Sequence, residues 1–168
     1  MVESILHLLE RLFGTSMFAK CMITFIISMI PIVELRGAIP VGVGILGLPV
    51  YTATLISLVG NMAPVPFIII FARRVFTWMR TRSHRLGALA DRLENKAKAK
   101  GSGLYRGELI GLIIFVAIPL PGTGAWSGAL IAAILNRRLK AALPAIALGV
   151  LIAGVLIAGI TYGFKSLL

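Results

Sequence analysis

The sequence predicts an all-α integral membrane protein that forms a single membrane domain over residues 1–168. Of its residues, 58% are hydrophobic and only 14% are charged, whereas about 25% are charged in an average soluble domain. The mean hydropathy is +0.98. A soluble domain of this size has too much surface for its volume to bury so much apolar area. These proportions exclude an ordinary soluble enzyme, a disordered chain and a secreted disulfide scaffold.

The positive charge is concentrated in two segments. The net charge is +11, and nearly all of it comes from residues 73–108 and 136–140. Because cytoplasmic loops of membrane proteins are enriched in Lys and Arg, we expect both segments to face the cytoplasm. Membrane lipids are expected partners, since anionic headgroups attract such segments. A nucleic-acid partner is not expected, because the basic residues lie between long apolar runs.

The first half of the chain predicts an interfacial amphipathic helix over residues 1–16 and a first repeat over residues 17–72. Two short apolar pieces, 17–33 and 41–50, flank the sequence PIVELRGAIP. Each is short of the roughly 20 residues that a membrane span needs, so together they predict a re-entrant, broken-helix hairpin. In the alternative layout, residues 17–33 form a full span and the symmetry described below is lost.

The first hairpin is followed by a full-length span over residues 50–72. Pro64 and Pro66 predict a kink in this span. Asn61 lies next to the prolines and either lines a pathway or satisfies the broken helix. The span runs into the basic cytoplasmic loop 73–108.

The second half, residues 109–168, has the same order of elements. Short apolar pieces at 109–118 and 125–135 flank PLPGTG, and residues 141–164 form another long span. The first long span ends inside and the second starts inside, so the two halves have opposite orientations. The sequence therefore predicts an inverted repeat, which is typical of transporters with a site at the repeat interface.

Glu34 is the strongest candidate functional residue. It lies between two apolar runs, and an acid at membrane depth costs about 2.5 kcal/mol or more. Because burial favours the neutral carboxyl group, we expect Glu34 to exchange protons near neutral pH. Arg36 follows, and its planar guanidinium suits a phosphate or carboxylate. The alternative is a structural ion pair between the two.

The second turn combines helix-breaking prolines with glycines that let backbone amides approach a ligand. Thr123 is expected to cap the following arm. Arms that begin near Gly37 and Thr123 would direct two positive helix ends at the centre and form an anion site. Trp126 either lines that pocket or packs in the core. The expected substrate-binding residues are Arg36, Gly37, Pro119, Pro121, Gly122, Thr123, Gly124 and Trp126.

Other chemistry is not indicated by the sequence. Cys21 is the single cysteine, and neither His7 nor His84 has a neighbour at metal-ligand spacing. No nucleophile and base are paired. We therefore expect no enzyme activity, no metal and no cofactor.

The strings ELRGAIP (34–40) and PLPGTGAWSG (119–128), each after a short apolar arm, resemble the small multidrug export protein family of prokaryotic membrane proteins. More distantly, the layout is similar to the DedA/VTT superfamily, whose members are implicated in moving polyprenyl phosphate or phospholipids across membranes. That resemblance implies that Glu34 is the acid of the first hairpin. It also implies that Pro119, Pro121 and Gly122 form the proline-glycine turn of the second.

Taken together, these features predict a proton-coupled transporter that moves an anionic lipid such as a polyprenyl phosphate, or a related amphipathic substrate. One alternative is a small multidrug efflux protein in which Glu34 pairs with a cationic substrate. Another is a non-transporting scaffold or assembly factor in which Glu34 is purely structural. A homodimer is one option, because a second copy would help so small a chain to enclose a pathway.

Overall fold

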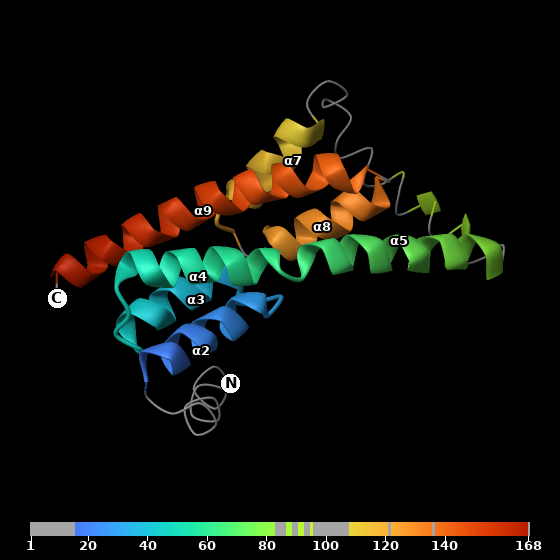
Figure 1. Cartoon of the computed structure of the whole chain (residues 1–168). Helices are drawn as coiled ribbons and strands as arrows, with labels where there is room; N and C mark the ends of the chain where they lie inside the picture. Colours follow the sequence, from blue (N-terminus) through green and yellow to red (C-terminus); the bar gives the residue numbers. More distant parts are fainter. Residues whose placement is uncertain are drawn as a thin grey trace. The chain divides into compact units, whose positions relative to one another are not determined.

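The computed structural model of the chain is built from helices (Figure 1). It describes residues 16–82, 87, 88, 91, 92, 95, 108–120, 122–135 and 137–167, and the side chains of these except 108 and 164–167. No strand occurs within these ranges, which confirms the all-α prediction. The expected amphipathic helix of residues 1–16 falls outside the described residues, apart from Ser16. The helices are α2 (Met17–Met29), α3 (Glu34–Gly44), α4 (Val50–Met62), α5 (Val65–Arg82), α7 (Glu108–Ala117), α8 (Ala125–Ile134) and α9 (Leu139–Leu167).

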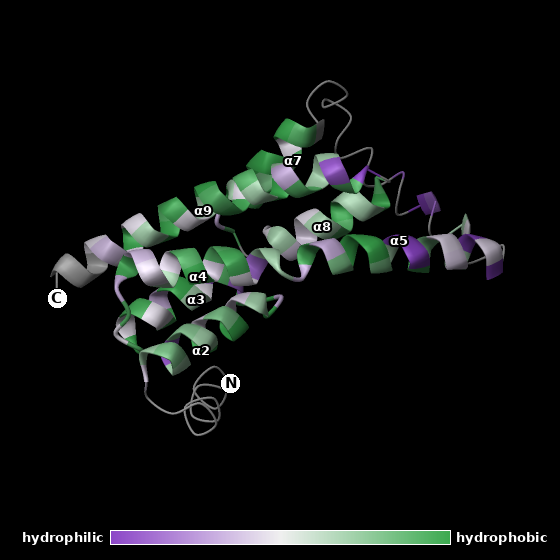
Figure 2. Cartoon of the chain, viewed as in Figure 1, coloured by the Kyte–Doolittle hydropathy of each residue, from purple (hydrophilic) through white to green (hydrophobic). Residues whose placement is uncertain are grey.

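Among the described residues, two stretches are long and apolar enough to cross a membrane, and they confirm the two predicted long spans. They are Val50–Arg82, with 33 residues, and Leu139–Gly163, with 25. The first consists of α4 and α5, which are separated at residues 63–64 because Pro64 and Pro66 lack N–H donors. The prolines thus interrupt the helix at the expected place, and the kink itself stays a prediction. In Figure 2 the hydrophobic colour along α4 and early α5 gives way to hydrophilic colour toward Arg82.

The remaining helices are short. α2 has 13 residues, α3 has 11, and α7 and α8 have 10 each. At a rise of 1.5 Å per residue, each is about 20 Å long or less. The hydrocarbon core of a bilayer is about 30 Å thick. None of these four helices is therefore long enough to span the core alone.

The start of α3 differs from the expected start of the second arm. The helix begins at Glu34 rather than near Gly37, and Pro40 lies inside it. The turn occupies residues 30–33, directly after Met29, because Pro31 already prevents α2 from continuing. Proline at position 40 removes only one backbone donor, and α3 continues through it to Gly44.

The chain divides into two compact units, and each is described by itself. Unit 1 comprises Met1–Ala63 and Leu151–Leu168, and unit 2 comprises Pro64–Val150. These boundaries differ from those of the expected repeats, 17–72 and 109–168.

In unit 1, α2, α3 and α4 pack against one another in all three pairings. A Cβ added to Gly42 of α3 would lie 3.1 Å from both Thr24 Oγ1 of α2 and Ala53 Cβ of α4. Gly60 of α4 sits directly on α2, where an added Cβ would lie 2.7 Å from the carbonyl oxygen of Phe25. Cys21 is half-buried on α2. Small residues thus set the close spacing of this three-helix unit.

In unit 2, α8 packs against α5 and α7. Gly128 of α8 lies against Val116 of α7, where an added Cβ would come within 2.6 Å of Val116 Cγ2. Gly149 of α9 lies against α7 as well, with the carbonyl oxygen of Ile113 only 2.8 Å from such a Cβ. Close approach at glycines therefore holds this unit together too.

Candidate functional site

Glu34 is the first residue of α3, and its side chain is almost fully buried, with 5% of its surface exposed. Its φ of +49° is the only positive value among the non-glycine residues that the structure describes. A left-handed conformation costs an L-residue roughly 1–2 kcal/mol. The turn fixes this conformation, because the Glu34 N–H donates to Ile30 O at 2.9 Å and the Gly37 N–H donates to Val33 O at 3.0 Å.

Arg36 and Gly37 lie in the first turn of α3, close to Glu34. The half-buried Arg36 interacts electrostatically with the Glu34 carboxyl group. A side chain at Gly37 would overlap Val33 Cγ1, so glycine is needed there for the tight entry into the helix. The turn thus holds one acid and one guanidinium at the start of a single helix.

Ser57 and Asn61 are buried on α4, one helical turn apart, and both have 0% of their surface exposed. Within the described part of the chain, Ser57 Oγ and both amide atoms of Asn61 have no hydrogen-bond partner. Leaving a buried polar group unsatisfied costs about 1–3 kcal/mol. Native proteins rarely tolerate this unless water, an ion or a ligand supplies the missing partner.

The helix register places Asn61 at the same end of unit 1 as Glu34. α3 and α4 are consecutive helices that run in opposite directions (Figure 1), and they meet at Gly42 and Ala53. Glu34 lies eight residues before Gly42, and Asn61 lies eight residues after Ala53. Both are therefore displaced from the contact by about 12 Å in the same direction.

Ser28 of α2 also lies at this end of unit 1, because Gly60 of α4 packs against its hydroxyl group. The Ser28 hydroxyl itself donates to Phe25 O at 2.7 Å. We call the set Ser28, Glu34, Ser57 and Asn61 the polar end of unit 1. It combines a buried acid with an amide and a hydroxyl that lack partners.

The second turn, in unit 2, is built differently. Gly122 has φ +81° and Gly124 has φ +147°, both in the region that favours glycine. The Thr123 hydroxyl lies 2.7 Å from Ile118 O and 2.8 Å from Leu120 O, and it shares its proton between these acceptors. Ser127 Oγ donates to Gly122 O at 2.8 Å. The turn therefore satisfies its own carbonyl groups.

The prediction that Thr123 caps α8 is wrong. The N-cap is Gly124, and no side chain caps the helix. The Thr123 hydroxyl is already engaged with the carbonyl groups that follow α7. Gly124 instead provides the backbone conformation that leads into α8. Its φ is +147°, which glycine adopts without strain.

The other predicted residues of the second turn are distributed as follows. Pro119 is exposed, Trp126 is half-buried in the first turn of α8, and Pro121 lies outside the described residues. Glu34, Arg36 and Gly37 are brought together in unit 1, whereas the PLPGTG residues and Trp126 belong to unit 2. The expectation that the two turns share a pocket stays a prediction.

The sequence analysis did not single out Ser57 or Ser28. A serine within an apolar run carries no signal of its own, because its burial depends on which face of the helix is covered. The spacing of Ala53, Ser57 and Gly60 on α4 gives the one available signal, since small residues three and four apart are typical of helix contacts in membranes. Within the described residues, no three His, Cys, Asp or Glu side chains are placed to hold a metal ion.

A family model described as small multi-drug export protein matches residues 34–156. The chain belongs to this family. The match begins at Glu34, directly after the first turn, and it covers the second turn and extends into α9. Family membership and the two long apolar helices together indicate a membrane protein.

The match does not extend to the DedA/VTT superfamily, so that more distant resemblance stays a prediction. No curated protein and no solved structure matches the chain.

Proposed function

We propose that this protein is a membrane transporter for an amphipathic substrate and that Glu34 couples transport to protons. One observation carries the proposal: the Glu34 carboxyl group is buried and held on a strained backbone at the polar end of unit 1. Strain of this kind persists only where the surrounding structure imposes it, and it is concentrated at functional sites. A purely structural acid would gain nothing from this conformation.

The neighbours of Glu34 support proton exchange. Asn61 and Ser57 offer buried donors and acceptors without partners, and water molecules bound to them would lead toward the carboxyl group. Intramembrane acids typically mark substrate pathways or proton relays. Protonation of Glu34 removes its attraction to Arg36, so each cycle of proton uptake changes the charge balance at the start of α3.

For the substrate we favour an anionic lipid such as a polyprenyl phosphate. Arg36 supplies a guanidinium that matches phosphate geometry. The N-terminus of α3 adds positive dipole potential. Since the Thr123 hydroxyl is occupied, the second turn contributes through the backbone at Gly122 and Gly124 and through Trp126. We expect binding and conformational change without enzymatic chemistry.

The second candidate is efflux of cationic or amphipathic drugs. The family description favours it. In this function Glu34 would pair with the substrate cation, and the buried Asn61 amide would accept a hydrogen bond from the drug.

The proposed layout has α2–α3 and α7–α8 as re-entrant hairpins in an inverted repeat. Support comes from the length of these helices, which are too short to span a bilayer core. Support also comes from the glycine contacts that each hairpin makes with the long helix after it. In this layout the basic segment 73–108 faces the cytoplasm of a prokaryotic inner membrane, and a homodimer completes the pathway.

Purified protein reconstituted into vesicles tests the proposal. A fluorescent polyprenyl phosphate analogue and the cationic dye ethidium are compared, each with and without an imposed pH gradient. We expect the gradient to accelerate movement of the lipid analogue and Glu34→Gln to reduce that movement to the level of empty vesicles. Asp91→Asn removes an exposed carboxylate and is the matched control, with transport expected to remain unchanged.

Three outcomes would redirect the proposal. Transport of ethidium alone favours efflux. Full activity of Glu34→Gln contradicts proton coupling through this residue. Transport of neither probe, together with loss of folding in Glu34→Gln, favours the scaffold alternative.

A further inference from the structure

The exposed face of α5 changes from apolar to basic at one level of the helix. Phe67, Ile70 and Phe71 are exposed. Arg74 is also exposed and lies on the same side, because it follows Phe71 by three residues and Ile70 by four. Trp78 is exposed four residues further on. Apolar side chains followed by a cation and a tryptophan are typical of the headgroup level of a membrane.

Arg73 lies at the edge of the face of α5 that packs in unit 2. It follows the buried Ile69 and Ala72. Its Nε and Nη2 atoms are buried and have no hydrogen-bond partner within the described part of the chain. A charged donor left unsatisfied costs more than a neutral one. The guanidinium therefore requires an acceptor from outside the described part of the chain, and its positive charge favours an anionic one.

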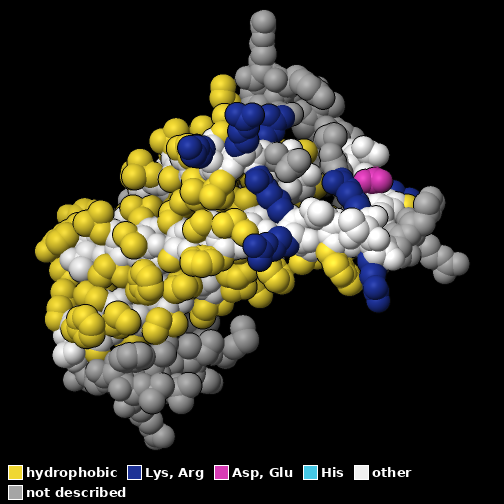
Figure 3. All heavy atoms as spheres, turned by 45° about the vertical axis from the view of Figure 1, so that its right-hand side comes forward, with side chains coloured by type: hydrophobic (Ala, Val, Ile, Leu, Met, Phe, Trp, Pro, Cys, Tyr) yellow, Lys and Arg dark blue, Asp and Glu magenta, His cyan; other side chains and the backbone are white. Residues whose placement is uncertain are grey.

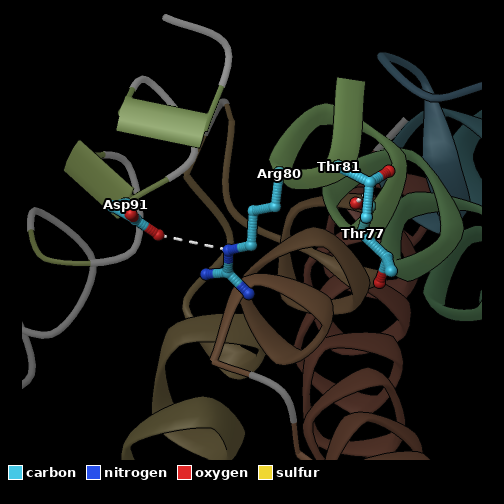
Figure 4. A network of polar contacts seen from close by, with 4 residues as sticks. All are labelled: Thr77, Arg80, Thr81 and Asp91. Atoms are coloured by element: carbon cyan, nitrogen blue, oxygen red, sulfur yellow. Dashed lines mark hydrogen bonds and ion pairs between the residues drawn. The ribbon is translucent and has the colours of Figure 1, made fainter. Parts of the chain in front are cut away.

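Arg80, two turns further along α5, shows the contrasting case. Its Nε lies 3.1 Å from Asp91 Oδ1. The dashed line in Figure 4 marks this ion pair. Asp91 is the only carboxylate of unit 2 whose side chain the structure describes, so within that part of the chain no second acid is left for Arg73.

Further exposed cations belong to the same unit. Arg138 and Lys140 are exposed at the start of α9. In Figure 3, Lys and Arg side chains gather on one face, next to exposed hydrophobic side chains. Among the described side chains, unit 2 is thus rich in positive charge and poor in acids.

We propose that Arg73 and Arg74 bind the phosphate of an anionic membrane phospholipid, with its acyl chains along Phe67 and Phe71. A guanidinium fork binds phosphate oxygens in pairs, and Nε and Nη2 of Arg73 form such a fork once the side chain turns outward to the lipid. The occupant is a lipid rather than a free anion, because the exposed aromatic side chains lie within about 5–10 Å of Arg74 along the helix axis. This site is independent of substrate transport.

Native mass spectrometry of the purified full-length protein tests the site. The protein is titrated with phosphatidylglycerol and with phosphatidylcholine that carries the same acyl chains. We expect the anionic lipid to be retained more strongly, and Arg73→Gln to weaken its binding about fivefold or more. Arg73→Lys should lose part of the affinity, because lysine keeps the charge but not the fork.

Arg80→Gln is the matched control, since it removes the same charge from the same helix at a guanidinium that already has a partner. Its lipid affinity should stay within about twofold of the parent. Arg74→Gln, at an exposed position, provides a second measurement if Arg73→Gln does not fold, and it should weaken binding about threefold.

Equal losses in the Arg80→Gln and Arg73→Gln proteins, or in the Arg80→Gln and Arg74→Gln proteins, would overturn the proposal in favour of diffuse charge. Equal retention of the two lipids would also overturn it. A third arm adds inorganic phosphate, and displacement of the lipid by low millimolar phosphate would assign the site to a free anion.

Discussion

The two hairpins, each considered within its own unit, pack on the next long helix in the same way but differ in their turns. Gly60 of α4 receives the backbone of α2, and Gly149 of α9 receives the backbone of α7. The second arms also carry a glycine at their contacts, Gly42 in α3 and Gly128 in α8. Helices in lipid approach closely through small residues, so this shared packing reflects the demands of the membrane.

The two turns differ in which residues adopt positive φ. The second turn uses glycine at both positive φ values and satisfies its carbonyl groups with the hydroxyls of Thr123 and Ser127. The first turn instead places the positive φ on Glu34, a buried acidic residue. The same type of connection can thus be made without strain. The strain in the first turn therefore marks it as the more specialised of the two.

The shared packing can be broken in both units with one type of substitution. Gly60→Ala and Gly149→Ala each place a Cβ within 2.8 Å or less of a backbone oxygen. We expect each to destabilise the protein by about 2–3 kcal/mol, measured as a lower melting temperature in detergent. Gly159→Ala on α9, where an added Cβ meets nothing within 4 Å, is the control. Damage from only one of the two substitutions would contradict equivalent packing.

Replacing a glycine of the second turn should cost somewhat less stability than the two packing substitutions. Gly124→Ala forces an L-residue into φ +147° and should cost about 2 kcal/mol. Gly44→Ala at the end of α3 has free space and ordinary φ, and should leave the melting temperature unchanged. If both variants melt like the parent, the second turn is not held in the observed conformation.

Removal of the Thr123 hydroxyl tests whether the second turn satisfies itself. Thr123→Val removes the hydroxyl donor that two carbonyl oxygens share and leaves each with its backbone N–H donor alone, so it should destabilise the protein by about 1 kcal/mol. Thr123→Ser keeps the hydroxyl and should restore the parental melting temperature. A Ser variant as unstable as the Val variant would show that the methyl group, not the hydrogen bonds, is responsible.

Relief of strain in the first turn should have the smallest effect on stability, and in the opposite direction. Glu34→Gly removes the cost of a left-handed residue and should stabilise the protein by about 0.5–1 kcal/mol while abolishing transport. Glu34→Ala removes the same carboxyl group but keeps the strain. If Ala stabilises as much as Gly, the effect comes from the buried carboxyl group rather than from the backbone.

The sequence predicts the long helices and the positions of both turns well, because these depend on local signals. Uninterrupted apolar runs identify the spans that end near residues 72 and 164, and Pro31 and PLPGTG identify the breaks. Two features of the turns are not accessible in this way. One is the left-handed conformation of Glu34, which no residue propensity predicts. The other is the Thr123 hydroxyl, which donates to carbonyl groups before the turn and therefore does not cap α8.

The candidate site is predicted only in part for a related reason. Glu34 is conspicuous because it is an acid in an apolar region. Ser57 and Asn61 become informative only when α2 and α3 cover the α4 face that carries them. Their lack of partners is a property of packing, which depends on residues distant in the sequence.

The half-buried Cys21 on α2 has a practical consequence. It is the only cysteine among the 168 residues, so a thiol-reactive fluorophore or spin label would attach to the unaltered chain at a single place. That place lies on the same helix as Ser28 and two turns before it. A spectroscopic signal from the native thiol would report on the first hairpin during a transport cycle without any engineered background.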